Sequence, residues 1–247
     1  MRQLSSAEVR QYTNPTLTEA FTQSIEAILK SDIDDLLPEN PYLVPSIAPH
    51  FAGDIVNQAL NAHLRIAQEE FIDGLLRDLA IFIAERTCDG RLSDQPGVDL
   101  EFNERGVHYL VSIRPGADKE STEAQNDRAE ALRRAMTRLS HTALPVLGNC
   151  YGRANTVYVD GCLRVTGPNF WYLISEDPRL YTDIIEKVSQ ETKACRDALA
   201  EQEACATNRM LKQFITRYCD ERGAYDWVKF VKHSSCDFDL NPFLPKA

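Results

Sequence analysis

The sequence lacks a long apolar run. No stretch approaches the roughly 18 apolar residues that a membrane-spanning helix needs, so we expect no membrane segment. The first residues, MRQLSSAEVRQYTN, also lack the apolar stretch of a secretory signal, which predicts a cytoplasmic location. With 11 glycines and 12 prolines among 247 residues, the composition excludes a fibrous or low-complexity chain.

Cysteine pairs are also missing. The chain has seven cysteines, an odd number, and no two of them have the CxxC spacing of a zinc ligand pair. Long chains with such a pattern rarely depend on a disulfide framework. We therefore expect reduced thiols in a reducing compartment and no cysteine zinc cluster.

Two further classes of site have no motif in this sequence. There is no Gly-rich phosphate loop, so we expect no nucleotide cofactor. The five histidines show neither the HxxxH nor the HExxH spacing of a zinc hydrolase.

The composition that remains is that of a globular protein. Hydrophobic residues make up 43% and charged residues 26%, which is enough for a core that folds alone. The net charge of −10 argues against non-specific coating of nucleic acid. A local basic groove stays compatible with it, because steering depends on how charge is distributed.

Helical periodicity dominates the first third of the chain. Apolar residues recur on one helical face within residues 1–37 and again, over a longer stretch, within 53–87. Between them, residues 38–49 carry four prolines and predict an ordered connector. We therefore predict an N-terminal helical arm, residues 1–37, and a main domain, residues 38–247.

The period then changes from helical to alternating. Residues 98–102 and 107–113 predict two strands joined as a hairpin, and we expect the helix that ends near residue 86 to back it. The fold class is therefore α/β, a small mixed sheet flanked by helices. Further strands are expected at residues 143–150, 156–159 and 163–165, and a polar helix at 121–140. From residue 169 onward helices are expected again, at 169–175, at 178–188 and, as a long polar helix, near 189–219.

The hairpin carries the residues that point to chemistry. Asp99 lies on its first strand, and Ser112-Ile113-Arg114 follow at the end of the second. In PD-(D/E)XK nucleases, an Asp on one strand and an acidic residue two positions before a Lys on the next converge on Mg²⁺. Alternation places residues 112 and 114 on one face. An Asp beside a hairpin is also typical of a solvated strand edge, so spacing alone leaves both interpretations open.

A family resemblance extends this reading. The stretches FIDGLLRDLAIFIAERTCDGRLSDQPGVDLEF, VHYLVSI, GNCYGR and FWYLISEDPRLYTDIIEKV resemble type II restriction endonucleases of the PD-(D/E)XK superfamily, in the group that cuts sites built on a GGNCC core. The resemblance covers roughly residues 40–232. It implies a restriction-endonuclease-like core, a homodimer around double-stranded DNA, and phosphodiester hydrolysis with Mg²⁺ or Mn²⁺.

The resemblance also assigns residues. Asp99 and the carbonyl of Ile113 would hold the metal ion, and Arg114 would stand in for the family's lysine. The second acidic position is Ser112. Arginine keeps its proton in proteins, so it cannot act as a base, although it can bind a phosphate. We therefore expect weakened or lost cleavage, with a catalytically dead DNA- or protein-binding module as the alternative.

Some assignments stay open at this point. An acid from a neighbouring helix could replace the second carboxylate, and the candidates are Asp127, Glu123, Glu70 and Glu85. Arg128, Arg133 and Arg134 could contact DNA phosphates, or they could form an exposed face paired with acidic neighbours. An unrelated helical interaction protein with a small sheet is the remaining alternative.

Overall fold

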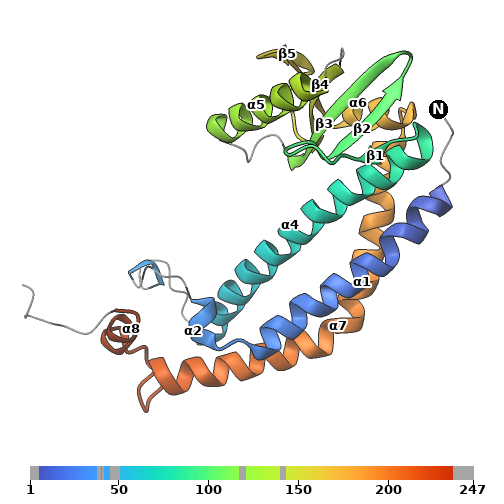
Figure 1. Cartoon of the computed structure of the whole chain (residues 1–247). Coiled ribbons are helices and arrows are strands. Elements are labelled where there is room, and N and C mark those ends of the chain that lie inside the picture. The colour runs from blue at the N-terminus through green and yellow to red at the C-terminus, as the bar shows by residue number, and fades with distance from the viewer. Residues whose placement is uncertain are drawn as a thin grey trace, which may run out of the picture. The chain divides into compact units, whose positions relative to one another are not determined.

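The computed structural model describes residues 6–37, 40, 42–44, 51–116, 121–139 and 143–235 (Figure 1). Packing divides the chain into two compact units. The sheet unit comprises residues 1–20 and 69–195, and the helical unit comprises residues 21–68 and 196–247. The division falls inside the three long helices. The arm of residues 1–37 followed by a domain of residues 38–247 stays a prediction, because the two units combine segments of both.

The sheet unit is built on six strands in the order β1-β2-β3-β4-β6-β5. The central pairs β3–β4 and β4–β6 are parallel, and the outer pairs are antiparallel. This mixed sheet with flanking helices confirms the α/β, restriction-endonuclease-like fold class. The strands are β1 (Arg91–Leu92), β2 (Leu100–Glu104), β3 (Val107–Gly116), β4 (Ala143–Tyr151), β5 (Val157–Val159) and β6 (Cys162–Thr166).

The predicted hairpin is the β2–β3 pair. Arg105 and Gly106 form its two-residue turn with φ of 51° and 78°, the left-handed conformation that such turns require. Leu100 pairs with Val111, so the strand begins two residues later than its alternating pattern suggested. Asp99 still donates its backbone N–H to the carbonyl of Val111 at 2.8 Å.

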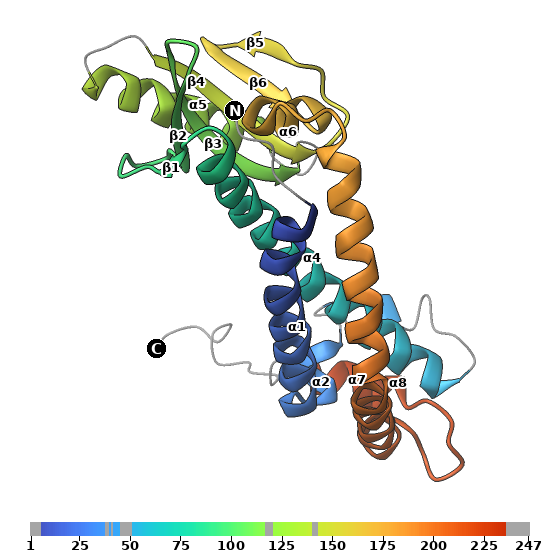
Figure 2. The same ribbon diagram turned by 90° about the vertical axis from the view of Figure 1, so that its right-hand side faces the viewer.

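Helices cover both faces of this sheet, as Figure 2 shows. On one face, α5 (Thr122–Arg138) packs Leu132 against Leu110 and Leu147. On the other face, α6 (Pro168–Ser175) and the last turns of α4 (Ala52–Thr87) meet the core residues of β2 and β3. The expectation that the helix ending near residue 86 backs the hairpin is therefore confirmed.

The helical unit has its own core. It contains parts of α1 (Ser6–Lys30), α4 and α7 (Leu180–Tyr218), together with α2 (Ile33–Leu36) and α8 (Trp227–His233). Its largest buried side chains are aromatic and include Phe214 and Phe230. Arg209 donates to the carbonyls of Ile28 at 2.8 Å and Ser31 at 2.9 Å, which satisfies acceptors that the end of α1 leaves free.

The structure differs from the sequence prediction in the long helix α7. The sequence suggested two helices between residues 178 and 219, but α7 is continuous, because no glycine or proline interrupts it. Most of the connector, residues 38–49, and the tail, residues 236–247, lie outside the described residues. Among the residues that the structure describes, no helix has the length and apolar character of a membrane span.

Candidate active site

Asp99 lies at the centre of a small polar network in the sheet unit. Its Oδ2 accepts the backbone N–H of Ile113 at 2.6 Å. Its Oδ1 accepts two hydrogen bonds from Arg77, one from Nε at 3.0 Å and one from Nη2 at 2.7 Å. Only 15% of the Asp99 side chain is exposed. The carboxylate is therefore held between α4 and β3 and already has a cationic partner.

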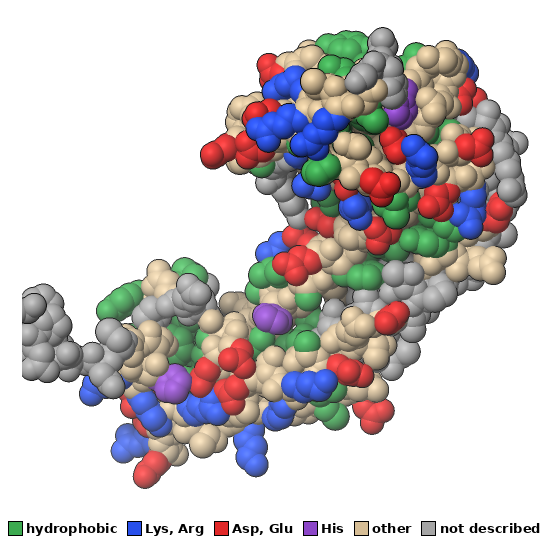
Figure 3. Space-filling view, in the orientation of Figure 1, with side chains coloured by type: hydrophobic (Ala, Val, Ile, Leu, Met, Phe, Trp, Pro, Cys, Tyr) green, Lys and Arg blue, Asp and Glu red, His purple; other side chains and the backbone are tan. Residues whose placement is uncertain are grey.

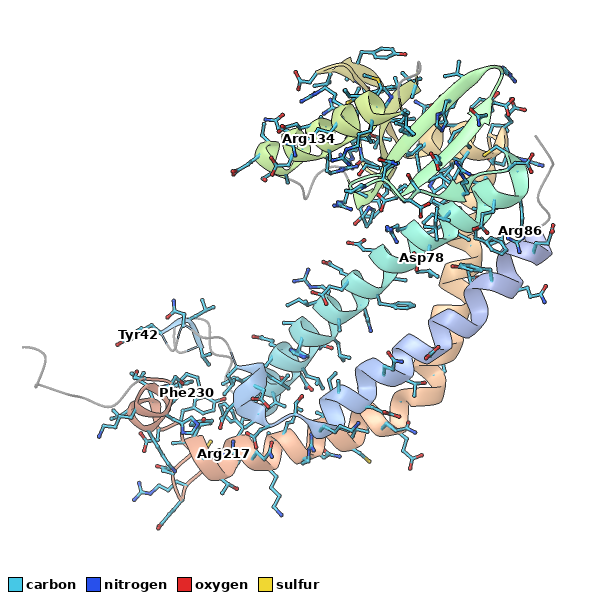
Figure 4. The ribbon with its side chains drawn as sticks, in the orientation of Figure 1. Tyr42, Asp78, Arg86, Arg134, Arg217 and Phe230 are labelled. Carbon is cyan, nitrogen blue, oxygen red and sulfur yellow. The ribbon has the colours of Figure 1, made fainter. Side chains whose placement is uncertain are left out.

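Arg77 was not anticipated from the sequence. It projects from α4 one residue before Asp78, which Figure 4 labels, and it also bonds Asp78 at 3.1 Å. The hydrogen bond to Asp99 raises the pKa of the Arg77 guanidinium above its ordinary value. The site thus contains a permanent positive charge beside its acidic residue.

The end of β3 places its residues on alternating faces. Ile113 is buried in the core shared with α4, whereas Ser112 and Arg114 lie on the face toward α5. Arg114 turns back and donates from Nη1 to the carbonyl of its neighbour Ile113 at 3.2 Å. The carbonyl assigned to a metal by the family resemblance therefore faces a guanidinium group.

Ser112 holds a second arginine. Arg128 of α5 is 8% exposed, and it donates from Nε to Ser112 Oγ at 3.2 Å and from Nη2 to the Ser112 carbonyl at 2.9 Å. A buried charge requires such partners. Ser112 and Arg128 thus tie β3 to α5, and a DNA contact by Arg128 stays a prediction.

The other two arginines lie farther along α5. Arg133 donates from Nη1 to the carbonyl of Asp160 at 2.6 Å, and Arg134 forms an ion pair with Glu130 one turn away. Figures 3 and 4 show that basic side chains gather on this helix with acidic side chains beside them. Their contact with DNA phosphates also stays a prediction.

An open cavity of ≈ 670 Å³ lies beside these residues, between β3, α4 and α5. Two carboxylates, Asp73 and Asp127, line it together with Arg114. Asp127 was one of the acids suggested by the sequence, but Asp73 was not. The lining residues are Asp73, Arg114, Pro115, Gly116, Ser121, Ala124, Asp127 and Arg128.

Asp73 is held in place by a residue of the GNCYGR stretch. The hydroxyl of Tyr151, at the end of β4, donates to Asp73 Oδ1 at 3.0 Å. Asp73 and Arg77 are four residues apart on α4 and so lie on one helical face. That spacing was the available signal, but a sequence does not show which helical face meets the sheet.

The other suggested acids do not line this cavity. Glu70 and Glu123 are exposed, and Glu85 pairs with Arg86 at 3.7 Å. Arg86 in turn stacks over the ring of Phe82 at 3.6 Å. Of the suggested acids, Asp127 is therefore the one that the fold brings to the cavity.

The arrangement does not fit a Mg²⁺ ion held by the expected ligands. Within the described ranges, no cluster of three or more His, Cys, Asp or Glu side chains could hold a metal ion. Asp99 has three donors on its two oxygens, and the Ile113 carbonyl has one. Mg²⁺ is usually held by one or two carboxylates and waters, whereas the carboxylate here is already paired.

The thiols offer no nucleophile at this site. Cys88, Cys150 and Cys162 are buried, and none of the five cysteines that the structure describes in full forms a disulfide. Burial raises the pKa of the Cys88 thiol to about 11 and raises the pKa of Cys150 as well. Of the other two cysteines that the structure describes, Cys205 is exposed and Cys219 is partly buried.

Comparison with known proteins decides the class. The model of the type II restriction endonuclease EcoO109I family matches residues 7–196, most of the chain. The chain belongs to this family. The matched region contains the whole sheet, the cavity and the residues that surround Asp99.

A second comparison matches a smaller part of the chain. Over 144 residues, the chain is 29% identical to a protein named 4-hydroxyproline 2-epimerase from Chromohalobacter salexigens. The match covers 55% of this chain and 44% of that protein. The chain thus spans less than half of that relative's length.

Proposed function

We propose that this chain binds double-stranded DNA and hydrolyses its phosphodiester bonds weakly or not at all. Membership of a type II restriction endonuclease family, over residues 7–196, is the observation that supports DNA as the substrate. The residues around Asp99 support the weakened chemistry. A serine and an arginine occupy the positions where the resemblance implies an acid and a lysine.

Several finer features belong to this proposal. They are the PD-(D/E)XK motif, a recognition site built on a GGNCC core, a homodimer, and Mg²⁺ or Mn²⁺ as the cofactor of any cleavage. They come from the family resemblance of the sequence. The site is a poor match for that cofactor, so we derive no catalytic step through a metal ion.

The residues at the cavity can still act on a phosphodiester. Arg114 is exposed at the cavity wall, and its guanidinium can donate two parallel hydrogen bonds to phosphate oxygens. It cannot accept a proton from the attacking water. Of the cavity-lining residues, Asp73 and Asp127 carry the carboxylates that could accept one. Binding without efficient water activation is therefore the behaviour that this site supports best.

The test compares binding with cleavage. A fluorescent duplex with a GGNCC core and a scrambled duplex would be titrated with the full chain, and supercoiled plasmid would be incubated with Mg²⁺ or Mn²⁺. We expect saturable duplex binding and little or no nicking. Failure to bind either duplex would reject the DNA proposal. Rapid, site-specific cutting would reject the proposed weakness.

A further inference from the structure

Each of the two oxygen groups that the resemblance assigns to the metal ion accepts hydrogen bonds from an arginine. Asp99 is bonded by Arg77, and the Ile113 carbonyl is bonded by Arg114. We propose that Arg77 and Arg114 occupy the place of the divalent metal ion, so that the site excludes Mg²⁺ and the protein binds DNA without it. The part that concerns DNA rests on the proposed function, whereas the exclusion of metal does not.

The Asp99 carboxylate has little capacity left for a cation. Two oxygens offer about four lone-pair positions. Three of these positions already accept hydrogen bonds, from Nε and Nη2 of Arg77 and from the N–H of Ile113. The Arg77 side chain is 38% exposed and Asp99 is 15% exposed, so Arg77 is the more solvent-accessible partner of the pair. A metal ion approaching from solvent would have to displace it.

The Ile113 carbonyl is used in the same way. The N–H and C=O of one residue in a strand point toward the same edge, so this carbonyl lies on the edge of β3 where Asp99 accepts the Ile113 N–H. Arg114 reaches that edge from the same strand and donates Nη1 to the carbonyl at 3.2 Å. The two arginines therefore cover two adjacent oxygen groups.

Charge balance favours the arginines over an added ion. Asp99 and Asp78 both bond Arg77, and Arg114 bonds the adjacent Ile113 carbonyl, so two guanidinium groups already balance the two carboxylates. A divalent ion would add like charge beside Arg77 and Arg114. Among the described residues, no group of three or more His, Cys, Asp or Glu side chains is placed to hold a metal ion. Guanidinium groups also supply what a phosphate needs, positive charge with paired donors. The chain can thus provide in its own side chains the charge that a metal ion would supply.

Metal binding is tested without DNA. The full chain is titrated with Mn²⁺, and electron paramagnetic resonance measures the free and bound ion. We expect wild type and Asp99→Asn to bind Mn²⁺ equally, within about twofold. Arg77→Met with Arg114→Met should bind at least about tenfold more tightly, a gain that adding Asp99→Asn removes. Arg86→Met, which removes one arginine elsewhere on α4, should match wild type.

Two results would overturn the inference. One is wild-type Mn²⁺ affinity that falls on Asp99→Asn, and the other is a folded double variant whose affinity does not rise. If circular dichroism shows that the double variant does not fold, the comparison of wild type with Asp99→Asn still decides.

The DNA part has a separate measurement. Duplex affinity in EDTA and in Mg²⁺ at equal ionic strength should agree within about twofold. Binding that requires Mg²⁺ would overturn metal-free binding and leave the proposed function intact. An absence of binding in both buffers would overturn the proposed function, while the Mn²⁺ titration would still judge the exclusion of metal.

Discussion

At the scale of single residues, Ser112 determines what Arg128 of α5 bonds. Ser112 provides its hydroxyl and its carbonyl to Arg128, and this arginine is buried. A carboxylate at residue 112 would meet the same guanidinium, which is a favourable partner for it. The position can therefore accept an acid without leaving a buried charge unpaired.

Cleavage should respond to restoring the acid and the amine. We expect Ser112→Glu combined with Arg114→Lys to raise plasmid nicking in Mg²⁺ by at least about tenfold. One preorganised charged group is commonly worth on the order of 100-fold in rate. Adding Arg77→Met should raise it further, because Asp99 would lose its internal partner. Lys232→Arg, an exposed conservative change in the helical unit, serves as the control. An inactive triple variant that still folds would contradict this expectation.

The sequence predicted some of these positions and missed others for a physical reason. Asp99 and Ser112 to Arg114 were found because strand periodicity and a two-residue turn fix which residues face each other. Arg77 and Asp73 were missed, because their meeting with the strands depends on how α4 rotates about its axis. Local spacing alone does not specify that rotation.

At the scale of elements, β4 and α6 approach closely at a glycine. A Cβ built on Gly148 would lie 2.5 Å from Cε2 of Phe170. Phe170 is fully buried, so it has little room to move. The GNCYGR stretch therefore includes a position where a side chain would force the helix away from the sheet.

A pair of alanine substitutions tests this contact. Gly148→Ala should destabilise the protein by about 1–3 kcal/mol, the usual cost of overpacking a core. Gly74→Ala is the matched control, because nothing lies within 4 Å of a Cβ at that helical glycine. It should be neutral or stabilise by about 0.5–1 kcal/mol. Chemical denaturation would measure both, and equal effects would refute the proposed close packing.

In the helical unit, one arginine links α2 to α7. Arg217 forms ion pairs with Asp32 and Asp34, and Asp34 also accepts a hydrogen bond from His233 at 2.9 Å. The side-chain hydrogen bond from Arg217 lowers the pKa of Asp32 below its ordinary value near 4. Stability from this pair is therefore present above about pH 4 and is lost as pH falls through the lower pKa of the folded state.

Thermal unfolding of Arg217→Met should show this dependence. At pH 7 we expect a loss on the order of 1 kcal/mol or less, since the pair is partly exposed to solvent. The difference from wild type should shrink as the pH falls below about 4. Arg222→Met, an exposed change four residues beyond Tyr218, should melt like wild type at both pH values. A difference that grows in acid would contradict the assigned sign.

The sequence predicted the hairpin strands better than it predicted the helices. The change of period near residue 98 and the turn Arg105-Gly106 located the first residues of β2 and β3 within two residues. The continuity of α7 was missed because its polar middle resembles a boundary, although no helix-breaking residue lies there. The buried role of Arg128 was missed because a basic face on a polar helix is most often solvated.

For the whole molecule, the negative net charge disfavours DNA binding, whereas the family to which the chain belongs acts on DNA. A net charge of −10 makes the chain as a whole repel DNA. We therefore expect the proposed DNA binding to rely on local groups such as Arg114 and the arginines of α5. Screening by salt should weaken these contacts, which is the general behaviour of phosphate binding.

Assembly is the last property to test. Duplex sites with two-fold symmetry are matched by two-fold symmetric proteins, so we expect a homodimer. Light scattering should give twice the 27.9 kDa of one chain.

The helical unit exposes 54% of Ile66, an apolar side chain that a partner chain could cover. We expect Ile66→Glu to shift the mass toward one chain, whereas Tyr158→Glu, 70% exposed in the sheet unit, should not. A mass of one chain for the wild type would exclude the dimer. A dimer that Ile66→Glu leaves intact would place the interface on another surface.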